Sequence, residues 1–193
     1  MDSTQKQIAC RSCDQNRRRL LKLSAAGGAA LAAGAVSALA AGKGPTALPA
    51  NRPQHAVDRF LASMNCSQAV LETYAPMVGL STDNARRVSA AFAGGMGMGE
   101  ECGAVTGAFM VIGLKYGKTV DRNSRADKKT FAAVARFMEE FKKRHQKTGC
   151  SELLGTDMGT PEGVKEAADK GLFTSACPGY VRSAAEILDD IMA

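Results

Sequence analysis

The sequence has no tryptophan, only two histidines and few aromatic residues, which make up 5% of its 193 residues. Glycine (20) and proline (6) are too few for a collagen-like or low-complexity chain, and a hydrophobic content of 45% is too high for a disordered one. No long heptad pattern or set of long apolar runs is present, which excludes a coiled coil and a polytopic membrane protein. The composition therefore indicates one ordinary soluble domain with an appendage.

The net charge of +6 raises the question of a nucleic-acid partner. Six of the 25 basic residues but only two of the 19 acidic residues precede residue 41, so the rest of the chain carries a net charge of about +2. The three tyrosines and seven phenylalanines do not alternate with arginine or lysine, as they would on a base-stacking surface. We expect no nucleic-acid partner.

The scarcity of histidine also weakens the case for acid–base catalysis. His55 stands at the end of a linker and His145 at the charged end of a helix, so both are expected on the solvated surface. The acidic pairs Glu139-Glu140 and Asp189-Asp190 are adjacent on helices and point in different directions. No signature of a hydrolase or a transferase is present.

The first forty residues are typical of an export signal. Arg17 and Arg18, followed by Arg19, two apolar residues and Lys22, precede an uncharged stretch rich in alanine and glycine. This pattern resembles the twin-arginine signal, which the twin-arginine translocase reads as an address. The small-x-small sequence at 38–40 fits cleavage after residue 40, so we expect a periplasmic or otherwise extracytoplasmic mature protein.

The export signal divides the chain into three parts. We predict a signal peptide at 1–40, a linker rich in Gly, Pro and Ala at 41–52, and a helical domain at 53–193. Cys10 and Cys13 form a Cys-x-x-Cys pair inside the segment to be removed, and Asp14 follows where a c-type haem site needs histidine. No covalent haem is expected.

The domain has helical periodicity and no alternating strand pattern, which predicts an all-α fold. We expect a compact bundle of five or six short helices, with a Gly-rich loop before the central one. Helix starts, glycine stops and apolar spacing at i, i+3 and i+4 define the segments. The expected ranges are 66–78, 82–93, 102–116, 127–147, 161–171 and 177–191.

Each of the four cysteines of the domain stands at or beside a predicted helix start. They are Cys66, Cys102, Cys150 and Cys177. A helix start offers unpaired N–H groups and a partial positive charge, which stabilise a thiolate. One such position is ordinary, whereas four out of four indicate thiolate chemistry.

A glycine-rich loop leads into Cys102 and is expected to support this site. Its backbone can bring several N–H groups close to sulfur, and no Gly-Lys-Ser/Thr follows that would indicate a phosphate loop. Small residues after Cys102 would let another helix backbone approach closely. The supporting glycines are Gly94, Gly95, Gly97, Gly99, Gly103 and Gly107. Tight turns and helix packing alone would also explain these glycines.

The four cysteines are far apart in the sequence, with no Cys-x-x-Cys pair among them. Zinc fingers and ribbons use close pairs, and the ferredoxin spacings are absent as well. A shared site must therefore be assembled by the tertiary fold.

The pattern Cys66, Cys102-Gly103-Ala104-Val105-Thr106-Gly107, Cys150 and Cys177 resembles the redox-active C-GCAxxG-C-C family. It is also similar to the iron–sulfur part of the split-Soret cytochromes. That resemblance implies an iron–sulfur centre bound by these four cysteines, with an unidentified redox partner. The resemblance covers roughly residues 60 to 190.

Alternatives remain open at the level of the sequence. The cysteines could cycle as redox dithiols, or form two purely structural disulfides in an oxidising compartment. They could also bind soft metals such as Cu(I) or Zn(II), with Met96 and Met98 in the glycine loop as candidate additional ligands. Whether the site lies in one chain or in a homodimer is open too.

Overall fold

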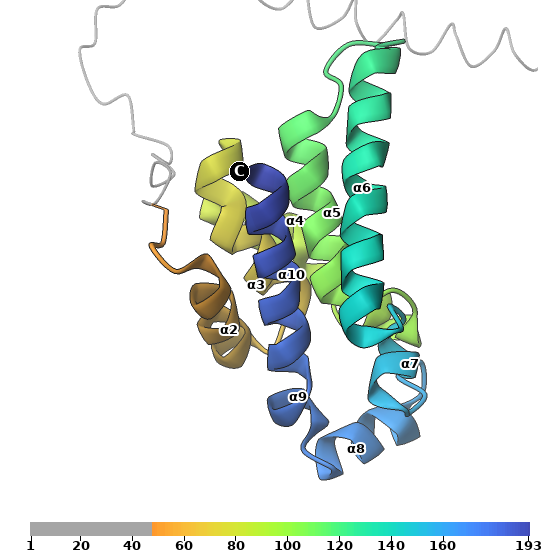
Figure 1. Ribbon diagram of the computed structural model, residues 1–193. Helices are drawn as coiled ribbons and strands as arrows, with labels where there is room; N and C mark the ends of the chain where they lie inside the picture. Colours follow the sequence, from red (N-terminus) through yellow and green to blue (C-terminus); the bar gives the residue numbers. More distant parts are fainter. Residues whose placement is uncertain (1–47) are drawn as a thin grey trace, which may run out of the picture. The chain divides into compact units, whose positions relative to one another are not determined.

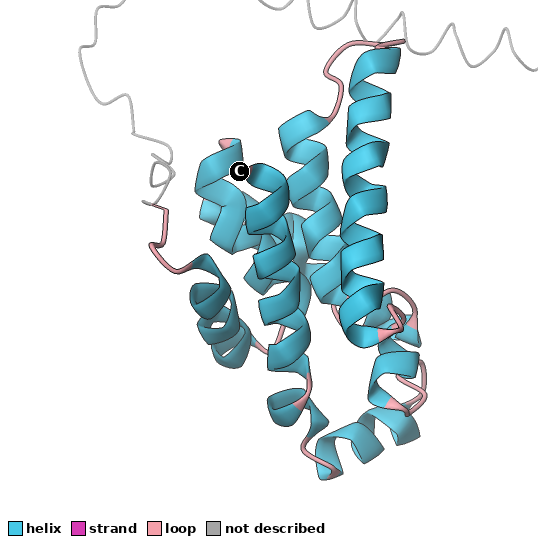
Figure 2. Ribbon diagram, viewed as in Figure 1, coloured by secondary structure: helices cyan, strands magenta, loops and turns pink. Residues whose placement is uncertain are grey.

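The structure is a computed structural model that describes residues 48–193. This part of the chain is all-α, as expected, and has no strand beyond one isolated antiparallel bridge between Glu101 and Gly149 (Figures 1 and 2). The α-helices are α2 (Arg52–Ser63), α3 (Cys66–Tyr74), α4 (Thr82–Ser89), α5 (Gly103–Tyr116), α6 (Ser124–His145), α7 (Cys150–Leu154), α8 (Pro161–Asp169), α9 (Leu172–Ser175) and α10 (Cys177–Met192).

The six expected segments each contain a helix, and two further helices were missed. Two expected helices end early and continue as short 3-10 turns, η1 (Ala75–Val78) and η2 (Ala90–Phe92). The missed helices are α2 and α9, while α7 begins at Cys150, where a helix start was expected. Helix α2 begins at Arg52, the last residue of the expected linker, because Asn51 caps it and Pro53 occupies its first turn, where proline is tolerated.

Two predicted helix caps are found where the sequence places them, whereas α6 begins at Ser124, three residues before its expected start. The Asn65 side chain accepts a hydrogen bond from the Gln68 N–H, and Thr160 accepts one from the Gly163 N–H ahead of α8. The Gln68 side chain does not reach back to the cap as in a capping box, and donates instead to the Arg86 carbonyl. This bond ties α3 to α4.

The main hydrophobic core lies around α3, which packs against α2, α4, α5 and α10, while α6 covers α5 and α10. Tyr74, Phe137 and Phe141 are its largest fully buried side chains. Val88 and Phe131 stand at the apolar spacing that predicts a buried helix face, but they are exposed instead, by 55% and 69%. Val88 is the second-last residue of α4, and Phe131 lies in the first half of α6.

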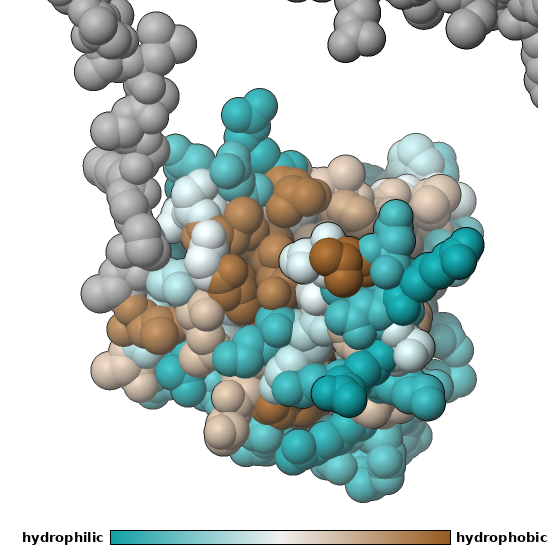
Figure 3. Space-filling model, turned by 90° about the horizontal axis from the view of Figure 1, so that it is seen from above, coloured by the Kyte–Doolittle hydropathy of each residue, from teal (hydrophilic) through white to brown (hydrophobic). Residues whose placement is uncertain are grey.

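The end of the bundle seen from above in Figure 3 carries an apolar area surrounded by hydrophilic side chains. Leu114 at the end of α5 is 47% exposed, and Val120 in the following loop is 62% exposed. Ile191 and Met192 at the end of α10 pack partly buried against the core. This end is opposite to the starts of α5 and α10 (Figure 1).

Several predictions concern residues outside the described part of the chain. These are the signal peptide at 1–40, its Arg17 and Arg18, and the Cys10 and Cys13 pair. Among residues 48–193, no helix combines the length and the hydropathy needed to span a bilayer.

Candidate four-cysteine site

The four cysteines occupy equivalent positions on four different helices. Cys66, Cys150 and Cys177 are the first residues of α3, α7 and α10, and Cys102 directly precedes α5. Helices α5 and α10 both begin at the lower end of the bundle, where α7 and α9 lie (Figure 1). All four cysteines are free thiols.

A short backbone pairing brings the segments of Cys102 and Cys150 together. The Cys102 N–H donates to the Thr148 carbonyl at 2.9 Å, and the Cys150 N–H donates to the Glu100 carbonyl at 2.6 Å. These two bonds flank the bridge between Glu101 and Gly149. The pairing fixes the two helix starts side by side although 47 residues separate them in the sequence.

The four cysteine side chains line one cavity of about 390 Å³. Cys102 and Cys150 are buried, with 5% and 7% exposed, and the other two are half-buried. The rest of the wall is apolar apart from the Tyr180 hydroxyl. It comprises Phe60, Met64, Ala93, Gly94, Gly97, Leu153, Leu154, Met158, Val164, Phe173 and Tyr180. The cavity thus combines soft sulfur donors with a hydrophobic surround.

The glycine loop forms one side of this cavity in a left-handed conformation. Gly94, Gly95, Met96, Gly97 and Gly99 all have positive φ, between 60° and 73°. Four of these five residues are glycines, which adopt positive φ readily because they have no Cβ. A Cβ on Gly99 would overlap Ser151 Oγ, so the loop packs directly against α7.

The glycines after Cys102 permit two close approaches. A Cβ on Gly103 would overlap the Cys66 sulfur and lie 3.0 Å from the Ala93 Cα. A Cβ on Gly107 would lie 2.9 Å from the Ser67 carbonyl oxygen. The absence of side chains at these two positions therefore lets α5 lie against α3 with the Cys66 thiol between them.

Cys66 is the most acidic of the four thiols. A hydrogen bond from the Cys102 thiol, together with the N–H groups of Gly94, Cys66 and Ser67, lowers the Cys66 pKa to about 7 against the opposing effect of burial. The Gly94 N–H belongs to the glycine loop, which thus supplies a donor to sulfur. At a pH close to this pKa, Cys66 is therefore divided between thiol and thiolate.

The other three thiols are shifted in the opposite direction. The hydrogen bond to Cys66, burial and the negative charge of Cys66 raise the Cys102 pKa. Burial, followed by repulsion from Cys66, raises the Cys150 pKa to about 11. The same causes, with added repulsion from Cys150, raise the Cys177 pKa to about 12. One thiolate therefore opposes ionisation of its neighbours unless a cation joins the site.

The four thiols line a cavity and do not converge on one position. Nowhere in residues 48–193 do three Cys, His, Asp or Glu side chains gather closely enough to enclose a single metal ion. Met96 and Met98 were the methionines expected near the site, but the methionines that line the cavity are Met64 and Met158. Met98 is 62% exposed. Met96 and Met98 are not among the cavity residues.

Both histidines are less solvated than expected. His145 lies between the rings of Phe141 and Tyr180, at centroid distances of 4.7 Å and 5.0 Å, and its Nε2 is buried without a hydrogen-bond partner. Burial, and to a lesser extent Arg144, lowers its pKa. His55 is half-buried and bonded to Thr73. Phe141 precedes His145 by one turn of α6, whereas Tyr180 comes from α10, a contact that the sequence alone does not show.

Fold and cavity together define a class: an all-α protein that gathers four thiols, each from a helix start, around one apolar cavity. The chain belongs to the family whose description reads "Putative redox-active protein (C_GCAxxG_C_C)", which matches residues 64–191 and so includes all four cysteines. Neither the curated proteins nor the solved structures contain a match to this chain. The family establishes the protein as redox-active at the level of its class.

Proposed function

We infer that the protein is an exported electron-transfer protein whose Cys66, Cys102, Cys150 and Cys177 hold an iron–sulfur centre. The observation that carries this proposal is that four thiols from four separate helix starts line a single cavity of about 390 Å³. Thiolates are the ligands that iron–sulfur clusters use. When bound, such a centre supplies reversible one-electron chemistry.

The electrostatics of the cavity support a cationic occupant. Ionising all four thiols in an apolar cavity is unfavourable, as the raised pKa values of Cys150 and Cys177 indicate. Iron would offset this repulsion, because a coordinated thiol is deprotonated outright. The N–H groups of Gly94 and Ser67 would stabilise the charge that remains on Cys66.

The apolar wall has a separate role. Phe60, Leu153 and Phe173 line the cavity and limit the access of water to the sulfur atoms. A dry surround and hydrogen bonds to sulfur are the means by which a protein sets a cluster's reduction potential. The size of the cavity, larger than the space within a single-ion site, also suits a group with several metal atoms.

Thiol–disulfide chemistry is the second candidate, and one observation favours it. Cys66 and Cys102 are hydrogen-bonded to each other, and the Cys66 pKa of about 7 is typical of an attacking thiol. In this chemistry the two thiols would lose two electrons and two protons to an oxidant and form a disulfide. Cys150 and Cys177 would then be neutral thiols near neutral pH.

The first experiment is the visible absorption spectrum of the anaerobically purified protein, with iron, sulfide, copper and zinc analysis. We expect bands between about 320 and 460 nm with matching iron and sulfide. Cys102→Ser should abolish them, whereas a Cys10→Ser/Cys13→Ser variant should retain them. A colourless, metal-free protein that forms a reversible Cys66–Cys102 disulfide would contradict the cluster and favour the dithiol.

Export is part of the proposal because the twin-arginine translocase carries folded proteins, which allows a cluster to be inserted first. Changing both Arg17 and Arg18 to Lys should hold the precursor in the cytoplasm, as measured by fractionation. Unchanged recovery from the periplasm would refute this route. The cluster and the export route are thus tested separately.

A further inference from the structure

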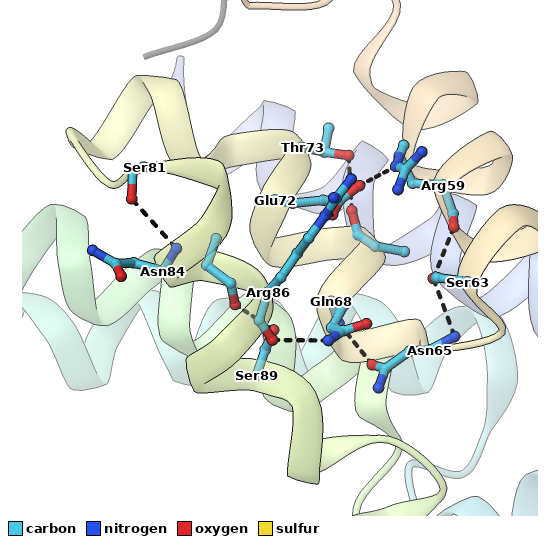
Figure 4. A network of polar contacts seen from close by, with 12 residues as sticks. Arg59, Ser63, Asn65, Gln68, Glu72, Thr73, Ser81, Asn84, Arg86 and Ser89 are labelled. Carbon is cyan, nitrogen blue, oxygen red and sulfur yellow. Dashed lines mark hydrogen bonds and ion pairs between the residues drawn. The ribbon is translucent and has the colours of Figure 1, made fainter. Parts of the chain in front are cut away.

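A second cavity, of about 250 Å³, lies between α2, α3 and α4 and contains no cysteine. Its lining residues are Pro49, His55, Arg59, Glu72, Thr73, Pro76, Thr82 and Arg86. The polar network that forms one side of it is drawn in Figure 4. Unlike the cysteine cavity, this one is built from charged side chains.

Glu72 is the anion of this network and lies at its buried base. Its side chain is 4% exposed, and each carboxylate oxygen accepts from one guanidinium, Oε1 from Arg59 Nε and Oε2 from Arg86 Nε. Arg59 reaches it from α2 and Arg86 from α4 (Figure 4). The carboxylate is therefore fully paired, as a buried charge must be.

The two arginines carry more charge than Glu72 neutralises. Each contacts Glu72 through Nε, at the base of the guanidinium, and has four further N–H bonds on its terminal nitrogens. Their side chains are 31% and 43% exposed, so these nitrogens are reached from solvent. Among the residues that line the cavity, two cations against one anion leave a net charge of +1, while Asp58 and Asp83 are close enough to act on His55 and Arg86 without lining it.

His55 adds no charge near neutral pH. Thr73 donates its hydroxyl proton to the Ala69 carbonyl at 2.8 Å, so in the 3.0 Å contact with His55 the ring Nδ1–H must be the donor. Burial, the largest effect, and Arg59 lower the His55 pKa, although Glu72 and Asp58 oppose this. Pro49 and Pro76 provide apolar wall on the same cavity.

We propose that this cavity binds a small organic carboxylate. The fork of a guanidinium matches the planar carboxylate group, and the local charge of +1 is balanced by one negative charge. A dianion such as phosphate would bring excess negative charge close to the Glu72 carboxylate. The proline wall and the volume leave room for a short apolar body attached to the carboxylate.

Butyrate is a suitable probe, added to the full chain and followed by ¹H–¹⁵N NMR of the backbone amides and the arginine side-chain Nε–H groups. We expect saturable shifts at Arg59, Glu72 and Arg86. Arg86→Gln should weaken binding about tenfold, the loss expected for one charge-assisted hydrogen-bonding group. The matched control is Arg87→Gln, because Arg87 is the next residue of α4, is exposed and does not line the cavity.

Glu72→Gln separates a binding site from a purely structural network. It raises the charge of the lining to +2 and replaces one of the two acceptor oxygens by an NH2 group, which frees one Nε–H donor, so butyrate should bind more tightly, by about tenfold. A structural network predicts lower stability with no gain in binding. Circular dichroism checks that each variant is folded. Arg86→Lys keeps the charge but loses the fork, so it should bind butyrate more weakly than the parent chain. It provides the test if Arg86→Gln does not fold.

Three results would overturn the proposal. They are no saturable shift at butyrate concentrations of tens of millimolar, equal binding by the Arg86→Lys and parent chains, and tighter binding of inorganic phosphate than of butyrate. The proposal is independent of the iron–sulfur centre. Cys102→Ser should therefore lose the centre and still bind butyrate.

Discussion

Two hydrophobic clusters meet at the cysteine cavity, and they differ in size and in burial. The main cluster spans α2, α3, α5, α6 and α10, and nearly all its members are completely inaccessible. The small cluster consists of Cys150, Leu154, Met158 and Ala167, of which only Ala167 is completely inaccessible. One side of the cavity is thus formed by the large, inaccessible cluster and the other side by the small, slightly exposed one.

The cysteines are divided between these clusters. Cys102 belongs to the main cluster and Cys66 packs against it, Cys150 belongs to the small cluster, and Cys177 packs against both. A group bound by all four thiols would therefore connect α7 to the bundle. Since ligand binding stabilises the state that binds, such a group would strengthen the small cluster more than the main one.

The largest expected effect comes from a cavity mutation in the main cluster. Phe137 is completely buried, stacks on Phe141 at 5.9 Å and contacts Phe109 edge-on. Phe137→Ala should lower the free energy of unfolding by about 3 to 5 kcal/mol. Urea unfolding of the metal-free protein, followed by circular dichroism, measures this loss.

The matched change in the small cluster is Leu154→Ala, at a side chain that is 9% exposed. Its cost should be about 2 kcal/mol, the lower end for such truncations, because the thin cluster can collapse around the gap. Amide exchange in α7 and α8 should quicken while that in α3 and α5 stays slow. Equal costs for the two variants would show that the clusters form one cooperative core.

The second prediction concerns the contact between Cys66 and α5. Gly103→Ala places a methyl group onto the Cys66 sulfur and the Ala93 backbone, so it should cost about 1 to 3 kcal/mol and displace the thiol. Gly113→Ala is the control, since it lies on the same helix with open space at its Cβ and should stabilise by about 0.5 to 1 kcal/mol. Thermal unfolding of both variants tests the pair, and similar melting temperatures would contradict the close approach.

The sequence was sufficient for the local features of this fold. Asn65, Thr160 and the glycine stops located helix ends, because capping depends on residues close together in the chain. The placement of cysteines at helix starts followed for the same reason. Helix α2 was missed although Asn51 caps it and Pro53 fits a first helical turn.

Features that depend on distant residues could not be predicted. Helical periodicity shows that a face is apolar but not how far a neighbour covers it, so the exposure of Val88 and Phe131 came from the tertiary structure. The bridge at Glu101 and the burial of Glu72 between two arginines likewise join residues far apart in sequence. No local pattern marks such contacts.

The smallest effect expected is the pH dependence of Cys66 in the metal-free protein. Only the thiolate reacts with iodoacetamide, so alkylation of Cys66 should be half-maximal near pH 7 and fall about tenfold per pH unit below that. Cys150, with a pKa of about 11, is the internal control and should stay unmodified at neutral pH. Mass spectrometry of peptides measures both, and earlier modification of Cys150 would contradict the assignment.

The same pKa values fix the sign of the stability change with pH. The Cys66 pKa lies below the unfolded value of about 8.5, so its contribution is complete above that pH and is lost as the pH falls through about 7. Cys150 and Cys177 have raised pKa values, so theirs is complete below about pH 8.5 and is lost as the pH rises towards 11 and 12. The contribution of these three thiols to the free energy of unfolding should therefore be greatest near pH 8.5. Cys66→Ser should abolish the loss of stability below that pH and leave the loss above it in place.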